Sequence, residues 1–176
     1  MKLILSIALV MIGFYSDLLC QQYLTRSAEI SFFSLTPIEN IEAHNKQVSA
    51  IFDVSNGAIA FSVPIRAFHF EKALMEEHFN ENYMETESFP SSTLKGSISE
   101  WSEASEQVYN DGKDHQVIVG GVLNIHGVDI TTEFPGTISF NKNSWTLKCE
   151  FEVDPEVFDV SIPSLVRKQI AEQILI

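Results

Sequence analysis

The feature that most constrains the fold is an alternation of apolar and polar residues with period two, which runs through most of the chain. It is clearest at 145–153, where apolar residues at every second position are separated by Thr146, Lys148, Glu150 and Glu152. Successive side chains of a β-strand point to opposite faces, so this pattern predicts a strand with one buried and one solvated face. The same pattern recurs in several other segments, which predicts an all-β protein.

Short turns between these segments predict antiparallel neighbours. The segments 48–54 and 58–65 flank Asn56-Gly57, which is a strong hairpin signal. The alternating segments 117–125 and 128–134 flank His126-Gly127 in the same way. About eight such strands joined by short turns predict an up-and-down barrel or a sandwich, since closure of a sheet removes its unpaired edges.

The segment 61–96 departs from this pattern. The alternation of Phe61, Val63 and Ile65 slips so that Phe68 and Phe70 carry the apolar face, which indicates a bulge or a sharp bend. A helical pattern follows at 72–82, with Met75, Phe79 and Tyr83 at i, i+4 and i+8. A strand, an aromatic-rich helix and a strand predict a lid across a barrel, and hence the enclosure of something apolar. A second short helix is predicted at 163–173.

Two motifs carry a family resemblance. The run HFNENYMETESFPSSTLKG at 78–96 resembles the signature of the YceI-like family of bacterial periplasmic proteins. The run VGGVLNIHGV at 119–128 is similar to that family's hairpin, in which a Gly-containing strand ends in an aliphatic-His-Gly turn. The order and spacing of the two motifs also fit, and the likeness extends over residues 21–176.

The resemblance implies an eight-stranded antiparallel lipocalin-like barrel with a short lid helix between strands and a short C-terminal helix. It also implies a lumen that holds a polyisoprenoid, a quinone tail or a fatty-acyl chain, without catalysis and without a cofactor. Family members usually continue into a closing strand after the last helix, whereas here only Ile174-Leu175-Ile176 remains. Closure of the barrel is therefore the point at which this chain departs from the family pattern.

The strand phases and the resemblance together predict the residues that contact the ligand. The strands are expected to supply Phe32, Phe61, Val63, Ile65, Leu94, Val119, Leu123, Trp145 and Phe151, and the helix Met75 and Phe79. His44 and His78 are expected near the barrel mouth, where either one would orient a polar headgroup.

The first 20 residues are expected to be a signal peptide that is removed. Lys2 precedes a nearly unbroken apolar run from Leu3 to Tyr15, which is too short for a membrane span of about 20 residues. The domain is then 21–176, and the protein is periplasmic or secreted and not integral to a membrane. A lipoprotein modified at Cys20 is the less favoured alternative, because Asp17-Leu18-Leu19 lacks the small residues of such a cleavage site.

Composition narrows the partners further. The net charge of −13 argues against nucleic acid and against an anionic membrane surface, since both select basic patches. Cys149 would be the only thiol after cleavage, in phase with the buried face of its strand, and is interpreted as a small hydrophobe. The sequence does not decide the oligomeric state, and a dimer remains open.

Two other function classes remain open at this stage. The five histidines show no metal-ligand spacing, and no nucleophile or nucleotide motif is present, so neither catalysis nor a metal site is expected. An enzyme would need a perturbed acid–base pair inside the lumen. An interaction protein would have a filled barrel and an acidic outer face that binds a basic partner. Small barrels are often filled by side chains, and the sequence alone does not separate a filled barrel from a hollow one.

Overall fold

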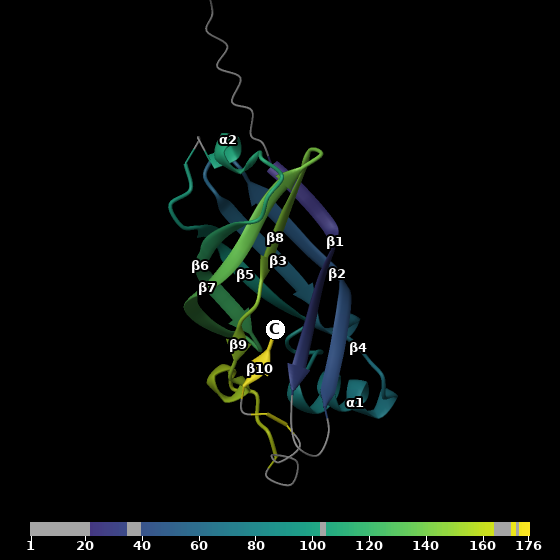
Figure 1. The fold of residues 1–176 in the computed structure, drawn as a ribbon. Coiled ribbons are helices and arrows are strands. Elements are labelled where there is room, and N and C mark those ends of the chain that lie inside the picture. Colours follow the sequence, from purple (N-terminus) through teal and green to yellow (C-terminus); the bar gives the residue numbers. More distant parts are fainter. Residues whose placement is uncertain (1–21, 35–39, 103–104, 164–169, 172) are drawn as a thin grey trace, which may run out of the picture.

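The computed structural model describes residues 22–34, 40–102, 105–163, 170–171 and 173–176. Within these ranges the chain forms one antiparallel sheet of ten strands that curls on itself into an open barrel (Figure 1). The strands are β1 (Gln22–Ser34), β2 (Ile41–Asp53), β3 (Ala58–Pro64), β4 (His69–Phe70), β5 (Ser91–Ile98), β6 (His115–Ile125), β7 (Val128–Asn141), β8 (Ser144–Cys149), β9 (Glu152–Val153) and β10 (Ile174–Leu175). The helical segments are η1 (Ile65–Ala67), α1 (Ala73–His78), η2 (Phe79–Tyr83), α2 (Ser105–Tyr109) and η3 (Pro155–Phe158).

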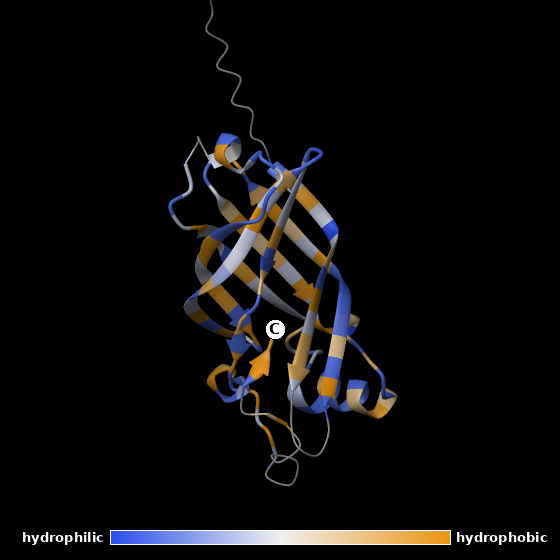
Figure 2. Ribbon diagram, in the orientation of Figure 1, coloured by the Kyte–Doolittle hydropathy of each residue, from blue (hydrophilic) through white to orange (hydrophobic). Residues whose placement is uncertain are grey.

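The alternation in the sequence becomes the inside and outside of this barrel. Along β7, Phe134, Gly136, Ile138 and Phe140 are buried, and along β8 every second residue is exposed. Figure 2 shows the result as alternating hydrophobic and hydrophilic bands along the strands. The predicted barrel-like all-β fold is confirmed. The sheet has ten strands in place of the predicted eight, and three of the ten, β4, β9 and β10, contain only two residues each.

The predicted hairpins are present, and their turns have the expected residues. Ile125 pairs with Val128 across a two-residue turn, in which His126 and Gly127 have φ of 51° and 79°. Positive φ at both positions matches the twist of the flanking strands, which is the type I′ geometry. The turn at Asn56-Gly57 lies in a four-residue loop between paired Asp53 and Ala58, with only Gly57 at positive φ.

The slip in the alternation after β3 is a bend. Residues Ile65–Ala67 form one turn of 3₁₀ helix, and the strand resumes as β4, which pairs with β2. Asn45, fully buried on β2, donates from Nδ2 to the carbonyl of Pro64 at 2.8 Å and accepts the amide of Gln47 at 2.8 Å. One buried side chain therefore holds the end of β3 where the chain turns.

The sheet bends sharply between β5 and β6, where Gly96 pairs with Gly121. A Cβ at Gly96 would lie 2.0 Å from the carbonyl oxygen of Gly120, and a Cβ at Gly121 would lie 2.4 Å from that of Lys95. Only glycine allows the two backbones to approach this closely, and such kinks are a common way to curve a sheet into a barrel.

The predicted lid helix is present as α1 followed by η2. Its second half is π-helical, with the amide of Met84 bonded to the carbonyl of Phe79 at 2.9 Å. The five-residue helix α2 was not predicted, because the sequence SEQVY shows no apolar periodicity. The helix predicted at 163–173 falls largely on residues outside those that the structure describes.

The C-terminal strand closes one end of the barrel. β10 lies between β1 and β9, with Leu175 paired to Phe33 and Ile174 paired to Val153. The main chains of Phe151 and Ile176 exchange two hydrogen bonds, of 3.1 and 2.8 Å. The sheet order is thus β8-β7-β6-β5-β3-β2-β1-β10-β9, and β8 does not pair with β1.

Candidate functional site: an apolar cavity in the open barrel

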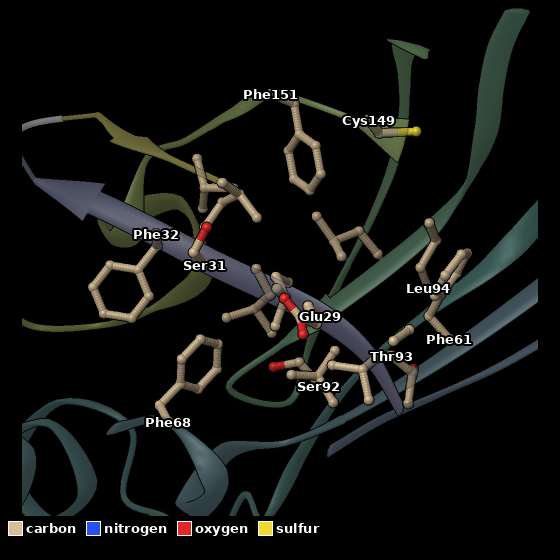
Figure 3. A pocket seen from close by; sticks show the side chains of 18 of the residues that line it. Glu29, Ser31, Phe32, Phe61, Phe68, Ser92, Thr93, Leu94, Cys149 and Phe151 are labelled. Atoms are coloured by element: carbon tan, nitrogen blue, oxygen red, sulfur yellow. The ribbon is translucent and has the colours of Figure 1, made fainter. Parts of the chain in front are cut away.

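A cavity of about 1050 Å³ lies inside the barrel. This volume is slightly above the range of roughly 300–1,000 Å³ that is usual for small-molecule sites. Its wall is mostly apolar and comes from nearly every strand, from the lid helix and from the C-terminal segment (Figure 3). The barrel is therefore hollow, and the space would suit an extended apolar molecule by burying apolar surface.

Most of the residues that the sequence predicted for the site line this cavity. They are Phe32, Phe61, Val63, Ile65, Met75, His78, Phe79, Leu94, Val119, Leu123, Trp145 and Phe151. The structure brings them together in one space, and whether each one contacts a ligand stays a prediction.

His44 does not line the cavity, so its expected place at the mouth is wrong. The strand β2 begins at Ile41, seven residues before the predicted start, and its alternation buries Ala43 and Asn45. His44 therefore points outward. Its Nε2 lies 2.7 Å from Glu42 Oε1, and its side chain is half exposed.

One end of the cavity is closed by phenylalanines, which we call the lid end and define as Phe32, Phe68, Phe70 and Phe79. The ring of Phe79 lies 5.4, 5.6 and 5.1 Å from the rings of Phe32, Phe68 and Phe70. These centroid distances are typical of favourable aromatic pairs. The π-helical turn places Tyr83 and Met84 on the cavity side as well.

At the other end the lining residues Phe52 and Trp145 pack on Trp101, which together with Tyr109 lies outside the cavity lining. We call this group the tryptophan end and define it as Phe52, Trp101, Tyr109 and Trp145. Trp101 lies 5.1 Å from Phe52, 5.5 Å from Tyr109 and 5.6 Å from Trp145, measured between ring centroids. Its Nε1 donates to the main-chain carbonyl of Val54 at 2.6 Å. Trp101 thereby ties the loop after β5 to the β2–β3 turn.

Two groups in the cavity wall have shifted pKa values. Burial raises the pKa of the Cys149 thiol to about 11, and burial also raises the pKa of the Tyr83 hydroxyl. Both shifts favour the neutral form. Each group therefore behaves at neutral pH as part of an uncharged wall, in line with the interpretation of Cys149 as a small hydrophobe.

The two sequence motifs meet in space beside the lid. The ring of His126 lies 4.3 Å from that of Phe89, and its Nε2 is 3.2 Å from Glu85 Oε2. A Cβ at Gly127 would approach the Phe89 ring to 2.6 Å. The β6–β7 turn thus packs on the segment that follows the lid helix.

Sequence reasoning missed several residues of the cavity wall. They include Phe52, Ile59, Phe68, Phe70, Tyr83, Met84, Phe134 and Ile138. Phe134 and Ile138 lie on the buried face of β7, and the alternation in the sequence could have predicted them as wall residues. Tyr83 and Met84 are neighbours, and only the π-helical turn brings both to the cavity.

Two further observations concern the described residues only. They contain no group of three or more His, Cys, Asp or Glu side chains arranged to hold a metal ion. They also contain no helix that is long and apolar enough to cross a membrane.

An antiparallel open barrel around an elongated apolar cavity defines a class of small-molecule-binding folds, and comparisons place the chain within it. The model of the YceI-like domain matches residues 24–176. The chain therefore belongs to the YceI-like family, as the two motifs predicted. A comparison with curated proteins finds no match.

Solved structures show the same fold at low identity. BcnA of Burkholderia cenocepacia aligns with 17% identity and a TM-score of 0.68, covering 84% of this chain and 91% of that one. A polyisoprenoid binding domain from Saccharophagus degradans, implicated in plant cell wall breakdown, aligns with 12% identity and a TM-score of 0.73, covering 88% and 92%. A YCEI protein of Campylobacter jejuni aligns with 14% identity and a TM-score of 0.60, covering 81% and 84%. At these identities the likeness establishes the fold alone.

Proposed function

We propose that this protein is an exported, non-enzymatic binding protein that sequesters or carries an elongated apolar molecule in its barrel. The candidate ligands are a polyisoprenoid, a quinone tail and a fatty-acyl chain. The observation that carries the proposal is the apolar cavity of about 1050 Å³. Membership of the YceI-like family and the fold shared with a polyisoprenoid binding domain support it.

Burial of apolar surface would drive binding, at about 25 cal/mol per Å² removed from water. The wall is suited to a flexible chain because Met75 and Met84 adapt their shape more readily than branched side chains. Such a cavity discriminates by length and shape more than by hydrogen bonding.

The chemistry of the wall supports binding in preference to turnover. Cys149 and Tyr83 are the cavity residues with shifted pKa values, and both shifts are upward through burial. A thiol with a raised pKa is a poor nucleophile at neutral pH. The alternative of a filled barrel that serves only as a docking scaffold is disfavoured by the hollow interior.

The lid end offers a direct test. Phe79→Asp would place a carboxylate among three phenylalanine rings, at a desolvation cost of several kcal/mol if it stays charged. We expect retention of a fluorescent polyprenyl or acyl probe to fall more than thermal stability does. Leu74→Asp is the matched control, because Leu74 lies on the same helix, is 61% exposed and does not line the cavity.

Two outcomes would count against the proposal. Equal probe retention by a folded Phe79→Asp variant would reject the role of the lid. A wild-type protein that binds no apolar probe and co-purifies with none would reject the binding function itself.

Export is a separate part of the proposal and rests on the N-terminal sequence, which lies outside the described residues. The mature chain is expected to begin near Gln21 with Cys149 as its only thiol. Mass measurement of protein from its native compartment checks this. A retained leader, or a diacylglyceryl group on Cys20, would contradict it.

A further inference from the structure

We propose that the ligand enters through a lateral opening in the barrel wall between β1 and β8. Its apolar chain then lies in the cavity, and its uncharged polar headgroup stays in the opening. We call this opening the β1–β8 slot and define its walls as residues 23–31 and 144–149. The inference rests on the proposed function and adds to it where the headgroup lies and of what chemical class it is.

Within the part of the chain that the structure describes, the sheet topology leaves these two edges unpaired. β8 pairs with β7 only, and β1 pairs with β2 along its length and with β10 only at Phe33. The register of β1 against β2 also shifts between Thr25 and Ala28 and again between Ala28 and Ile30. Such irregularities bend a strand, and they keep an open edge from pairing with another chain.

The cavity wall shows that the interior extends out between these edges. β3, β6 and β7 contribute only alternate residues to the wall, as expected for a closed inner face. β8 contributes all six of its residues, including those whose side chains point outward, and β1 contributes both faces at 23–25 and 27–32. β2 and β5, which are paired on both sides, contribute neighbouring residues only at 50–52 and 92–94, so the longer two-faced contributions of β1 and β8 indicate that the cavity extends between these two strands.

The slot has defined ends. Near its upper end the ring of Tyr23 lies 6.5 Å from the rings of both Trp145 and Phe140, across the gap. At the lower end β10 joins the two sides through the pairing of Phe33 with Leu175. Figure 3 shows Glu29 and Ser31 on the β1 ribbon, and on a separate ribbon Cys149 at the end of β8 and Phe151 just after it.

The side chains at the slot are hydroxyl-rich, in contrast to the apolar interior. They include Thr25, Ser27, Ser31, Ser144 and Thr146. The hydroxyls of Thr25 and Ser27 lie 3.3 Å apart. Hydroxyls both donate and accept hydrogen bonds, and the unpaired edge strands add main-chain donors and acceptors. A polar headgroup would find its partners here.

The charges at the slot favour an uncharged headgroup. Among the described residues that line the cavity, Glu29 and Lys148 are the only Asp, Glu, Lys or Arg side chains, and Glu29 lies 3.6 Å from Lys46. Arg26 belongs to the β1 wall of the slot but is exposed and does not line the cavity. A phosphate or diphosphate is usually held by several cations or by bidentate arginine. The net charge of −13 adds repulsion for an anion. Alcohols, esters and quinone carbonyls fit the hydroxyl-rich rim.

The position of the headgroup is tested by a pair of photoreactive probes with the same chain. One carries a diazirine beside a terminal alcohol, and the other carries it at the far end of the chain. Mass spectrometry of the cross-linked peptides is expected to place the alcohol-end label at 23–31 and 144–149, and the chain-end label elsewhere in the wall. An alcohol-end label on 73–84, where His78 lies, would overturn the slot while leaving the binding function intact.

The class of headgroup is tested by equilibrium binding of a prenyl alcohol and its diphosphate. We expect the alcohol to bind at least tenfold more tightly. The double variant Ser144→Lys with Thr146→Lys is expected to narrow this ratio at least fivefold. Thr131→Lys is the control, since Thr131 is exposed on β7 and does not line the cavity. Diphosphate binding as tight as that of the alcohol would overturn the headgroup class, and binding of neither would overturn this inference together with the proposed function.

Discussion

The lid end and the tryptophan end of the cavity are both closed by aromatic rings, but different forces hold them. Trp101 packs on three rings and also donates a 2.6 Å hydrogen bond to the main chain of Val54. Phe79 packs on three rings and has no polar group of its own, so its contacts are dispersive and hydrophobic. Trp101 is tied to the barrel backbone through its own ring N–H, whereas the lid helix is tied through Glu76, whose Oε2 accepts the amide of Phe70 at 3.2 Å.

The lid segment has a further part-buried polar contact, in which Arg66 Nε donates to the hydroxyl of buried Thr86 at 3.0 Å. Its ion pairs lie nearer the surface: Arg66 contacts exposed Glu87 at 3.3 Å, and exposed His69 contacts the partly buried Glu76 at 3.6 Å. Pairs of this kind contribute about 0–1 kcal/mol. We therefore expect the tryptophan end to act as a rigid plug, and the lid end, whose central ring makes no hydrogen bond, to be the part that moves when the cavity volume changes.

The largest expected effect comes from a substitution at the tryptophan end. Trp101→Ala removes the ring contacts and the hydrogen bond to Val54, and we expect the free energy of unfolding to fall by about 3 kcal/mol. Urea denaturation measures the change. Trp101→Phe keeps a ring without the N–H and is expected to lose about half as much. A loss below about 1 kcal/mol for the alanine variant would remove the distinction between the two ends.

The second effect concerns Cys149, which lies in the wall between the two ends. With a pKa of about 11, about one thiol in a thousand is ionised at pH 8, so alkylation is expected to be about a hundredfold slower than in the unfolded chain. The rate should rise about tenfold per pH unit up to pH 11. A pH profile of alkylation measures this, and bound probe should slow it further.

The raised pKa of Cys149 also predicts that the folded protein loses stability at alkaline pH. The thiol is easier to ionise in the unfolded chain, so its contribution to stability is complete below about pH 9 and is lost as the pH rises towards 11. Cys149→Ser is the control for both measurements. A reaction rate equal to that of the unfolded chain would contradict the burial of this wall.

The third effect concerns the lid. Phe79→Ala is expected to weaken probe binding about tenfold and to lower the free energy of unfolding by only about 1–2 kcal/mol, because the residue is only partly buried. Paired titration and denaturation measure the two quantities. If Trp101→Phe weakens binding as much as Phe79→Ala does, the assignment of adaptation to the lid end is wrong.

The smallest effect concerns the contact between Glu85 and His126 beside the lid. Glu85→Gln weakens a 3.2 Å contact between the largely buried ring of His126 and the exposed carboxylate of Glu85, and is expected to cost about 1 kcal/mol or less. The packing of Phe89 on His126 remains, so probe binding should be unchanged. Thermal unfolding and probe titration check this, and a large loss in either would show that the lid is held by charge.

The sequence predicted the fold because the alternation and the turn residues report local geometry. His126-Gly127 and the slip after Ile65 each determine a structure within a few residues, and both appear where expected. The alternation of apolar and polar residues was enough to predict which side chains of β6 and β8 face the cavity. His44 was misplaced because it was assigned to a loop, whereas it lies in β2 ahead of a register shift between Asn45 and Val48. A one-residue shift of this kind exchanges the two faces of a strand, so the phase of Val48 does not extend back to His44.

Other features depend on contacts that no local pattern reports. The π-helical turn at Phe79–Tyr83 and the close approach of Gly96 and Gly121 arise from packing between segments. The open β1–β8 edge depends on the pairing of strands far apart in the chain, and an alternating strand looks the same whether or not its edge is paired.

The pairing of Phe33 with Leu175 has a kinetic consequence. It joins positions 175 − 33 = 142 residues apart, whereas most of the sheet is built from sequential hairpins. Forming such a distant contact early would cost much chain entropy, so the hairpins are expected to assemble first and β10 to dock last. Interactions made after the rate-limiting step slow unfolding more than they speed folding. The C-terminal strand therefore acts chiefly on the lifetime of the folded barrel.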